Sequence, residues 1–237
     1  MNFSKIYLLG DIHGDFNVVA NLITTAERDS LIVQVGDFGV GFNVDKEKRS
    51  LNKLNELLVS KNIALYAIRG NHENKQCFSN PAKFGFEYSN LHLLSDYTYK
   101  SINGKNWLFI GGATSIDRVY RTEGRDYWAD EKLDYQISKV KKCDVLITHS
   151  SPDVCFPHDT PYGLRKIIEQ FNPPRAYAEV EVLYKDLTEE REKLGKIFKK
   201  ASPSYLYFGH LHAKSEEIIN GCYCRLLDIN EVAEFPK

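Results

Sequence analysis

Five short segments of this chain carry side chains of the kinds that bind divalent metals. They are Gly10-Asp11-Ile12-His13-Gly14, Gly36-Asp37-Phe38-Gly39, Gly70-Asn71-His72-Glu73, Thr148-His149-Ser150 and Gly209-His210-Leu211-His212. Their carboxylate, carboxamide and imidazole groups suit divalent metals, and two metals held side by side are a tool for phosphoryl transfer. No packing requirement calls for such a series. The sequence therefore predicts a two-metal hydrolytic site.

The first two segments each place a carboxylate after an apolar run. Asp11 and His13 are two residues apart and can face one point, and the glycines beside them allow tight turns. Asp37 repeats the design, and its two oxygens can bridge two metals. Each residue also has an ordinary alternative, namely a turn for Asp11 and His13 and a helix or turn cap for Asp37.

The third segment separates a metal ligand from a catalytic group. Asn71 offers a neutral carbonyl oxygen to a metal, so its neighbour His72 points elsewhere and is free to act on a leaving group. The alternative is that Asn71 occupies a left-handed turn and His72 covers the surface. Glu73 either orients a ligand or caps the following segment.

The last two segments add three histidines. His149 follows an apolar run at residues 144–148, and His210 and His212 follow another at residues 205–208. One histidine after a strand needs no functional explanation. Three of them, together with the carboxylates above, favour a metal site over separate structural roles.

These segments lie at the ends of predicted strands that alternate with predicted helices. Strands are expected at residues 5–10, 31–35, 63–68, 91–94, 97–102, 107–111, 144–148, 205–208, 216–219 and 223–228, and helices at residues 16–28, 46–60 and 187–200. This order is typical of βαβ units whose active edge is formed by the carboxyl ends of the strands. Asn103-Gly104 and Asn220-Gly221 predict two hairpins. Asp15 is expected to cap the first helix.

Composition excludes several classes of function. The chain has 237 residues, 43% of them hydrophobic and 27% charged, and its 31 Lys and Arg nearly balance 32 Asp and Glu. This balance predicts no clear nucleic-acid-binding surface. We expect neither a signal peptide nor a membrane span, and the five cysteines, an odd set, are expected to be reduced thiols. The sequence predicts a cytoplasmic protein and does not indicate its oligomeric state.

The five segments, in this order, resemble the motifs of the calcineurin-like metallophosphoesterase superfamily. The likeness runs from residue 10 to residue 212, with every motif present. It implies a four-layer αββα sandwich with two mixed β-sheets flanked by helices, in agreement with the α/β or α+β pattern of the strands. The chain is expected to form one domain over residues 1–237.

The resemblance also implies a role for each residue. It implies one metal held by Asp11, His13, Asp37 and His212, and a second held by Asp37, Asn71, His149 and His210. His72 and Asp37 are the implied catalytic residues, with His72 giving a proton to the leaving group and Asp37 bridging the metals. We expect manganese first, with iron, zinc or nickel as alternatives, and a bridging hydroxide as the nucleophile.

The second segment departs from part of the superfamily. Protein serine/threonine phosphatases and symmetrical diadenosine-tetraphosphate hydrolases carry Gly-Asp-x-Val-Asp-Arg-Gly, whereas here Phe38-Gly39-Val40 follow Asp37. The arginine that binds phosphate in that form has no counterpart. We therefore predict a phosphomonoesterase or phosphodiesterase acting on a small phosphorylated substrate, nucleotides included. A protein phosphatase, a dinucleoside polyphosphate hydrolase and an inactive metal-binding interaction module remain as alternatives.

Two further regions are assigned to the substrate side. The loop at residues 111–131 supplies Arg118 and Arg121, which we predict to bind substrate together with Asn71, while Trp128 is expected to pack the loop against the core. Residues 151–200 are expected to form an insertion of loop and helices covering one side of the cleft. Within it, His158 and Asp159 are assigned to a surface turn.

Overall fold

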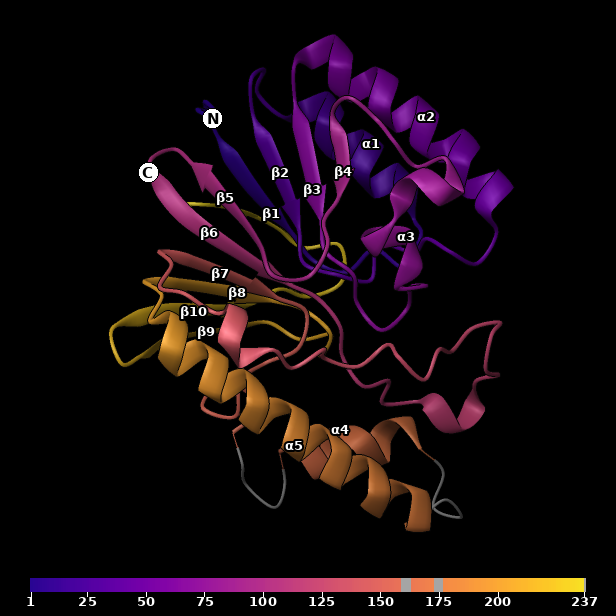
Figure 1. The fold of residues 1–237 in the computed structure, drawn as a ribbon, viewed down its shortest axis with the longest axis vertical. Helices are drawn as coiled ribbons and strands as arrows, with labels where there is room; N and C mark the ends of the chain where they lie inside the picture. The colour runs from indigo at the N-terminus through magenta and orange to yellow at the C-terminus, as the bar shows by residue number, and fades with distance from the viewer. Residues whose placement is uncertain (159–162, 173–176, 237) are drawn as a thin grey trace.

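Two β-sheets face each other and carry helices on their outer sides (Figure 1). The structure is a computed structural model that describes residues 1–158, 163–172 and 177–236. One sheet has the order β11 (Val232–Glu234), β1 (Ile6–Leu9), β2 (Leu31–Gln34), β3 (Ala64–Ala67) and β4 (Leu91–Leu93). The other has the order β5 (Thr98–Ile102), β6 (Lys105–Ile110), β7 (Val145–Thr148), β8 (Tyr205–Phe208), β10 (Cys222–Leu226) and β9 (Ser215–Ile219). The predicted pair of mixed sheets is confirmed.

Most neighbouring strands are parallel. In the first sheet β1 to β4 run parallel and β11 runs antiparallel to β1. In the second sheet β6, β7, β8 and β10 run parallel, and β5 and β9 are antiparallel edges. The carboxyl ends of the central strands therefore lie at one edge of each sheet, where the predicted ligands follow.

Three hydrophobic cores separate the four layers. Successive residues of a strand point to opposite faces of a sheet. Accordingly, Ile6 and Leu8 of β1 belong to the core between the sheets, and Tyr7 and Leu9 belong to the core beneath the helices. A third core joins the second sheet to its own helices. Because the central strands are buried on both faces, they read as continuous apolar runs.

The helices cover the outer faces of the two sheets (Figure 1). They are α1 (Phe16–Thr25) and α2 (Val44–Lys61) on the first sheet, α4 (Leu164–Phe171) and α5 (Tyr177–Ala201) on the second, the short α3 (Gln76–Ser79), and the 3₁₀ turns η1 (Pro81–Phe84), η2 (Arg118–Tyr120) and η3 (Ile137–Lys139). The predicted cap of α1 is confirmed, since the Asp15 carboxylate accepts the Asn17 N–H at 3.2 Å.

Two helix boundaries differ from the sequence prediction. Helix α1 ends at Thr25 rather than near residue 28, because Ala26 already has an extended backbone with ψ 150°. Helix α5 begins at Tyr177, before the expected residue 187, so the region at residues 151–200 contains more helix than its prolines suggested. The start of α5 was hard to predict because its apolar and charged residues alternate and do not form a clear helical pattern.

Both hairpins form at the expected turns. Asn103 and Gly104 join β5 to β6 with φ values of 48° and 75°, and Asn220 and Gly221 join β9 to β10 with φ values of 51° and 81°. Positive φ at both central residues is the geometry that Asn-Gly favours. The strand β11 was not predicted, because three residues on a sheet edge give too short a pattern.

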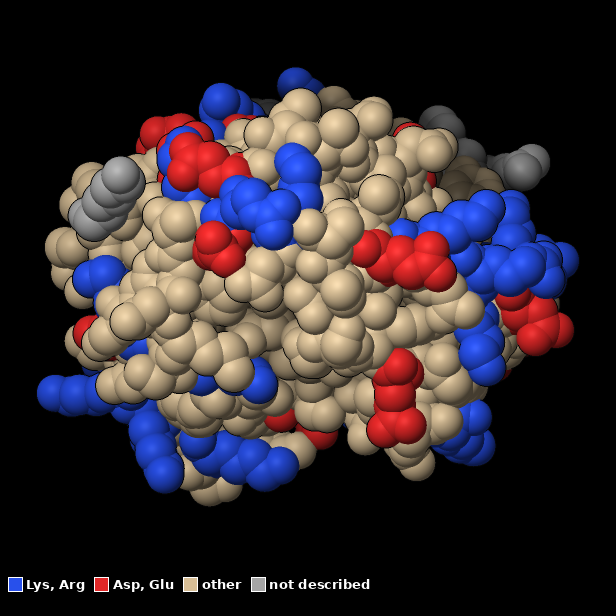
Figure 2. Space-filling view, turned by 90° about the horizontal axis from the view of Figure 1, so that it is seen from above, with Lys and Arg blue, Asp and Glu red and all other residues tan. Residues whose placement is uncertain are grey.

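Three expectations drawn from the composition can be compared with the structure. All five cysteines are buried free thiols. Figure 2 shows one face of the molecule, on which groups of Lys and Arg are interrupted by Asp and Glu. Among the helices in the described ranges, none combines the length and the apolarity that a membrane crossing requires.

Candidate metal centre

The predicted ligands of both sheets meet at one place. Two groups of side chains each gather potential ligand atoms within 4.8 Å of one another. The first group is Asp11, His13, Asp37 and His212, and the second is Asp37, His149 and His210. Asn71 Oδ1 lies 3.1 Å from His149 Nε2 and so joins the second group. The structure thus brings together all seven residues predicted to bind metal.

Asp37 is shared by the two groups. Its Oδ1 lies 3.3 Å from His149 Nε2 of the second group, and its Oδ2 lies 3.8 Å from His13 Nδ1 of the first. The carbonyl oxygen of Asp37 also accepts the backbone N–H of His13 at 2.8 Å. The loops that follow β1 and β2 are therefore joined at the one residue able to bridge two cations.

Several ligand residues have a backbone that side chains rarely adopt. His13, Asp37, His210 and His212 have φ values of 46°, 54°, 72° and 46°. Left-handed backbone at a residue other than glycine costs free energy and is concentrated at functional sites. Packing of the surrounding loops must therefore hold these residues in place.

Glycines next to the ligands give the side chains room. A Cβ at Gly36, whose φ is 112°, would lie 2.2 Å from His149 Nδ1, and a Cβ at Gly70 would lie 2.0 Å from Asp37 Oδ1. Neither approach is tolerable for a real side chain. Gly36 and Gly70 are thus required by close packing against a ligand.

His149 is oriented by a backbone carbonyl. Its Nδ1 lies 2.9 Å from the carbonyl oxygen of Val35, an acceptor only, so Nδ1 must carry a proton. When a metal binds, Nε2 would give up its own proton and offer its lone pair on the side of Asp37 and Asn71. Metal-binding histidines commonly donate their other N–H in this way.

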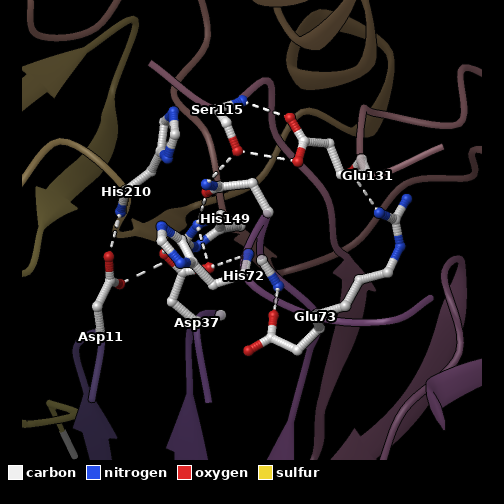
Figure 3. Close-up of polar contacts among 12 residues, drawn as sticks. Asp11, Asp37, His72, Glu73, Ser115, Glu131, His149 and His210 are labelled. Carbon is white, nitrogen blue, oxygen red and sulfur yellow. Dashed lines mark hydrogen bonds and ion pairs between the residues drawn. The ribbon is translucent and has the colours of Figure 1, made fainter. Parts of the chain in front are cut away.

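Asn71 is held by a chain of buried hydrogen bonds that continues through Ser115 and Glu131, whose contacts are drawn in Figure 3. Its Nδ2 donates to Ser115 Oγ at 2.9 Å, and Ser115 Oγ in turn lies 2.9 Å from Glu131 Oε2. Burial raises the pKa of Glu131 to about 8, although two hydrogen bonds from Ser115 oppose the rise. Cations bound nearby would favour the ionised carboxylate.

Glu73 joins two of the ligand-bearing loops. Its carboxylate accepts the backbone N–H of Gly39 at 2.6 Å and also that of Gly70, and it is fully buried. Burial first, and the charge of Asp37 second, raise the pKa of Glu73 to about 8. Of the two roles considered for Glu73, the structure favours the first, because Glu73 holds the loops that carry Asp37 and Asn71.

The electrostatic field of the site attracts positive charge. Burial alone would lower the pKa of His149, but the carboxylates of Asp37 and Asp11 outweigh it and raise that pKa to about 10. The pKa of Asp37 lies well below its usual range, because His149 and His72 outweigh the effect of its burial. Buried carboxylates that stabilise a cationic imidazole would equally stabilise a metal cation.

Two buried atoms of the site lack a hydrogen-bond partner among the described residues. They are Asp11 Oδ1 and His210 Nε2, one from each group. The other oxygen of Asp11 accepts the His210 backbone N–H at 2.9 Å, which aims the free oxygen inward. An orphaned buried acceptor is costly unless a ligand satisfies it. Orphaned acceptors, a field favouring cations and a mixed O and N donor set together fit two divalent metals.

His72 lies beside the two groups. Its backbone N–H donates to Asp37 Oδ1 at 2.9 Å, and its ring Nε2 is 3.9 Å from Asp37 Oδ2. The Arg121 guanidinium contacts the ring, with Nη1 2.9 Å from Nδ1. Burial first, and Arg121 as well, lower the pKa of His72 to about 4, although Asp37 raises it. The ring is therefore uncharged at neutral pH in this structure.

A small cavity of about 50 Å³ lies over the two groups. Its lining is Asp37, Asn71, His72, Ile116, Asp117, Arg121, Phe171, His210 and His212. A larger cavity of about 630 Å³ lies between α5 and the β9–β10 hairpin, but its lining contains none of the predicted ligands. We place the chemistry in the smaller cavity, because a reacting phosphate there would touch Asn71, His72 and the metals together.

The arginines of the loop at residues 111–131 separate in the structure. Arg121 lines the small cavity and is held by both carboxylate oxygens of Asp117, at 2.7 and 2.8 Å. Arg118 instead donates to Asp186 of α5 at 2.6 Å and is absent from the cavity lining. Arg121 therefore lies at the cavity and Arg118 away from it, and substrate binding by either stays a prediction.

Three further expectations about this side of the molecule have mixed outcomes. Trp128 packs against Phe42, with ring centroids 5.2 Å apart, on the surface rather than in the core. His158 is exposed and contacts Glu217, as a surface residue would. Asp159 lies outside the described residues.

Sequence reasoning missed several residues that shape the site. Ile116, Asp117 and Phe171 line the cavity, and Ser115 and Glu131 hold Asn71. Ser115 lies in the loop already singled out, and its hydroxyl beside a Gly-Gly turn was a usable signal. Glu131 gave none, because it reaches the site through tertiary contacts alone.

Comparison with known proteins agrees with this geometry. The sequence model of the family described as calcineurin-like phosphoesterase matches residues 4–214. No curated protein matches the chain. The solved structure of TT1561 from Thermus thermophilus shares 10% identity over 97% of both chains, with a TM-score of 0.52. A second structure shares 13% identity over 95% of this chain and 90% of its own, with a TM-score of 0.56. At these identities the two structures show a common fold.

Proposed function

Because the chain belongs to the calcineurin-like phosphoesterase family and is a metal-dependent phosphoric ester hydrolase, we propose that it hydrolyses small phosphate esters at the centre described above. The observation that carries this proposal is the position of Asp37, which both groups of ligand atoms share. A shared carboxylate is the simplest way to hold two cations close together. Two-metal phosphoesterases require that arrangement.

The proposed ligands divide between the two groups. Asp11, His13, Asp37 and His212 would hold one cation, and Asp37, Asn71, His149 and His210 the other. When bound, the two cations would neutralise charge on the phosphate and activate water as the nucleophile. We favour manganese, with iron, zinc or nickel as alternatives, because the mixed oxygen and nitrogen donors do not select strongly among these metals.

His72 is proposed as the proton donor to the leaving oxygen. It lines the cavity but stands beside the ligand groups, with Nε2 3.9 Å from Asp37. The ring must be protonated to act, and a bound phosphate would favour protonation because a nearby negative charge raises the pKa of a histidine. General acid help of this kind commonly contributes on the order of 10²–10⁴ in rate.

Arg121 is proposed to bind the phosphate of the substrate. Its guanidinium lies in the cavity beside His72, and Asp117 fixes its orientation through two hydrogen bonds. A planar guanidinium can bind a phosphate through two parallel N–H groups. The small cavity has room for the phosphate group, so the rest of a small phosphorylated substrate or a nucleotide would lie outside it. Phe171 at its rim could contact the group attached to the phosphate.

A substrate screen tests this proposal. Protein supplied with Mn²⁺ is expected to hydrolyse p-nitrophenyl phosphate or its bis ester, and a chelator should abolish the activity. Mononucleotides, cyclic nucleotides, dinucleoside polyphosphates and phosphopeptides then distinguish the substrate classes. Preference for phosphopeptides or dinucleoside polyphosphates would favour the alternatives. Undetectable turnover of every ester with two metals bound would contradict the proposed function.

A further inference from the structure

Two carboxylates, Glu131 and Glu190 of α5, hold neighbouring residues of the loop after β6. Glu131 Oε1 accepts the backbone N–H of Ser115 at 2.6 Å, and its Oε2 lies 2.9 Å from Ser115 Oγ. Thr114, the residue before Ser115, is held in the same way. Glu190 Oε1 accepts its backbone N–H at 3.2 Å, and Glu190 Oε2 lies 3.0 Å from Thr114 Oγ1. All four residues are buried. Two matched pairs thus hold consecutive residues of one loop.

Only one of the two pairs is joined to a proposed metal ligand. Asn71 Nδ2 donates to Ser115 Oγ at 2.9 Å, whereas the Thr114 hydroxyl is bonded to Glu190 of α5. We propose that Ser115 and Glu131 are positioning residues that hold the Asn71 amide with its oxygen toward the second ligand group. This inference rests on the proposed role of Asn71 as a metal ligand.

The direction of each hydrogen bond sets the orientation of the Asn71 amide. A serine hydroxyl has a single proton, and an ionised carboxylate accepts but cannot donate. With cations bound nearby favouring the ionised form of Glu131, the Ser115 proton goes to Glu131, and the oxygen lone pairs of Ser115 face Asn71. They accept the N–H of the amide, so that Asn71 Oδ1 points the other way, 3.1 Å from His149 Nε2.

Orientation matters because the two ends of a carboxamide are alike in shape but opposite in chemistry. Only the oxygen offers a lone pair to a cation, while the NH₂ group offers protons. With Asn71 2% and Ser115 0% exposed, water has little access to replace the hydroxyl as a partner. Without Ser115, the amide could turn its nitrogen toward the cation and weaken binding.

Glu131 is itself fixed from the loop that carries Asn71. Arg69, two residues before Asn71, donates from Nη1 to the carbonyl oxygen of Glu131 and from Nη2 to that of Lys132 at 3.0 Å. A Cβ at Gly112 would lie 2.5 Å from this guanidinium, so the glycine leaves room for the contact. The contacts, together with the chain from residue 69 to residue 71, form a closed ring of Arg69, Glu131, Ser115 and Asn71. Figure 3 shows the part between Ser115 and Glu131.

The matched pairs supply the test. Protein loaded with Mn²⁺ is titrated with a chromophoric chelator, which reports the affinity of each of the two ions. Ser115→Ala should weaken one ion by about 10- to 100-fold, the range usual for residues that orient a metal ligand, and leave the other in place. Ser115→Thr, which keeps the hydroxyl, should restore the affinity. Thr114→Ala should cost stability without this selective loss.

A second pair of variants covers the case in which Ser115→Ala does not fold. In Glu131→Gln the amide oxygen must still accept the Ser115 N–H, so its NH₂ faces the Ser115 hydroxyl. The hydroxyl proton then turns toward Asn71, and this variant should also loosen one ion. Glu190→Gln makes the same chemical change in the other pair and should not. Thermal unfolding in excess chelator measures the stability of each variant without metal.

Asn71→Ala separates failure of the inference from failure of the proposed function. If Asn71→Ala loosens an ion but Ser115→Ala and Glu131→Gln do not, the positioning role is wrong and the ligand role stands. If Ser115 and Thr114 variants weaken both ions equally, the loop is merely structural and the inference is overturned. If Asn71→Ala changes neither ion, the ligand assignment itself fails.

Discussion

The ligand groups and the cavity rim are held by the fold in opposite ways. Asp11, Asp37 and His149 are buried at strand ends, with glycines packed against their side chains. The loop at residues 111–131 forms part of the rim through Arg121, and its arginines Arg118 and Arg121 are held by charge pairs with Asp186 and Asp117. Close packing admits little change, whereas charge pairs on a loop are readily exchanged. The difference suggests that the metal chemistry is fixed by the fold and that substrate preference is set by the rim.

The largest effect is expected at the residue shared by both ligand groups. Asp37→Asn removes the charge that holds both cations, so metal content and activity should fall together. The loss of metal affinity should exceed a factor of about 10 to 100, which is usual when a residue that orients a metal ligand is replaced. Metal analysis and turnover of p-nitrophenyl phosphate check this. Full metal content with unchanged activity would break the distinction between ligand groups and rim.

His72 should affect turnover without affecting metal binding. His72→Asn removes the proposed proton donor, and kcat should fall by on the order of 10²–10⁴. Both metals should remain bound. Loss of an ion on metal analysis would instead make His72 a ligand and move it into the buried ligand group.

A pair of glycine variants compares the two regions directly. Gly36→Ala would press a Cβ against His149, whereas Gly124→Ala in the loop at residues 111–131 meets nothing within 4 Å, although both glycines have positive φ, 112° and 77°. Both variants carry backbone strain of about 1–3 kcal/mol. Only Gly36→Ala should also weaken metal binding. Calorimetric unfolding and chelator competition measure the two effects, and equal metal affinities would contradict the packing argument.

The two arginines of the loop at residues 111–131 should give the smallest effects on kcat/KM, and their effects should differ from each other. Arg121→Gln should lower kcat/KM by about 10- to 100-fold, since a hydrogen bond between charged groups contributes about 1.5–3 kcal/mol. Arg118→Gln loses a part-buried pair with Asp186, contributing about 0–1 kcal/mol to stability, and should leave kcat/KM nearly unchanged. Steady-state kinetics on one ester compares them. A larger kinetic effect at Arg118 would return it to the substrate site.

The ligand groups could be predicted from sequence because their signal is local. Each proposed ligand follows an apolar strand by a few residues, and parallel strands bring their carboxyl ends to one edge. Asp11 follows β1 and Asp37 follows β2, and these strands are parallel neighbours in one sheet, so both lie near the same edge. Local capping was equally legible, as at Asp15.

The sequence indicated His72 and Arg121 at the cavity but not the residues that support them, because long-range contacts place those residues. Arg118 turns away from the cavity only because Asp186, 68 residues later, lies beside it on α5. Glu131 reaches Ser115 through a loop without regular pattern, and β11 is a three-residue edge strand placed by pairing with β1. None of these features leaves a periodic trace in the sequence.

The central claim is that two cations share Asp37. Anomalous X-ray diffraction from crystals of the protein grown with Mn²⁺ tests it most directly, because the anomalous signal locates each ion. The account predicts two peaks per chain, one beside Asp11, His13 and His212 and one beside Asn71, His149 and His210, with Asp37 between them. A single peak, or peaks away from Asp37, would contradict it.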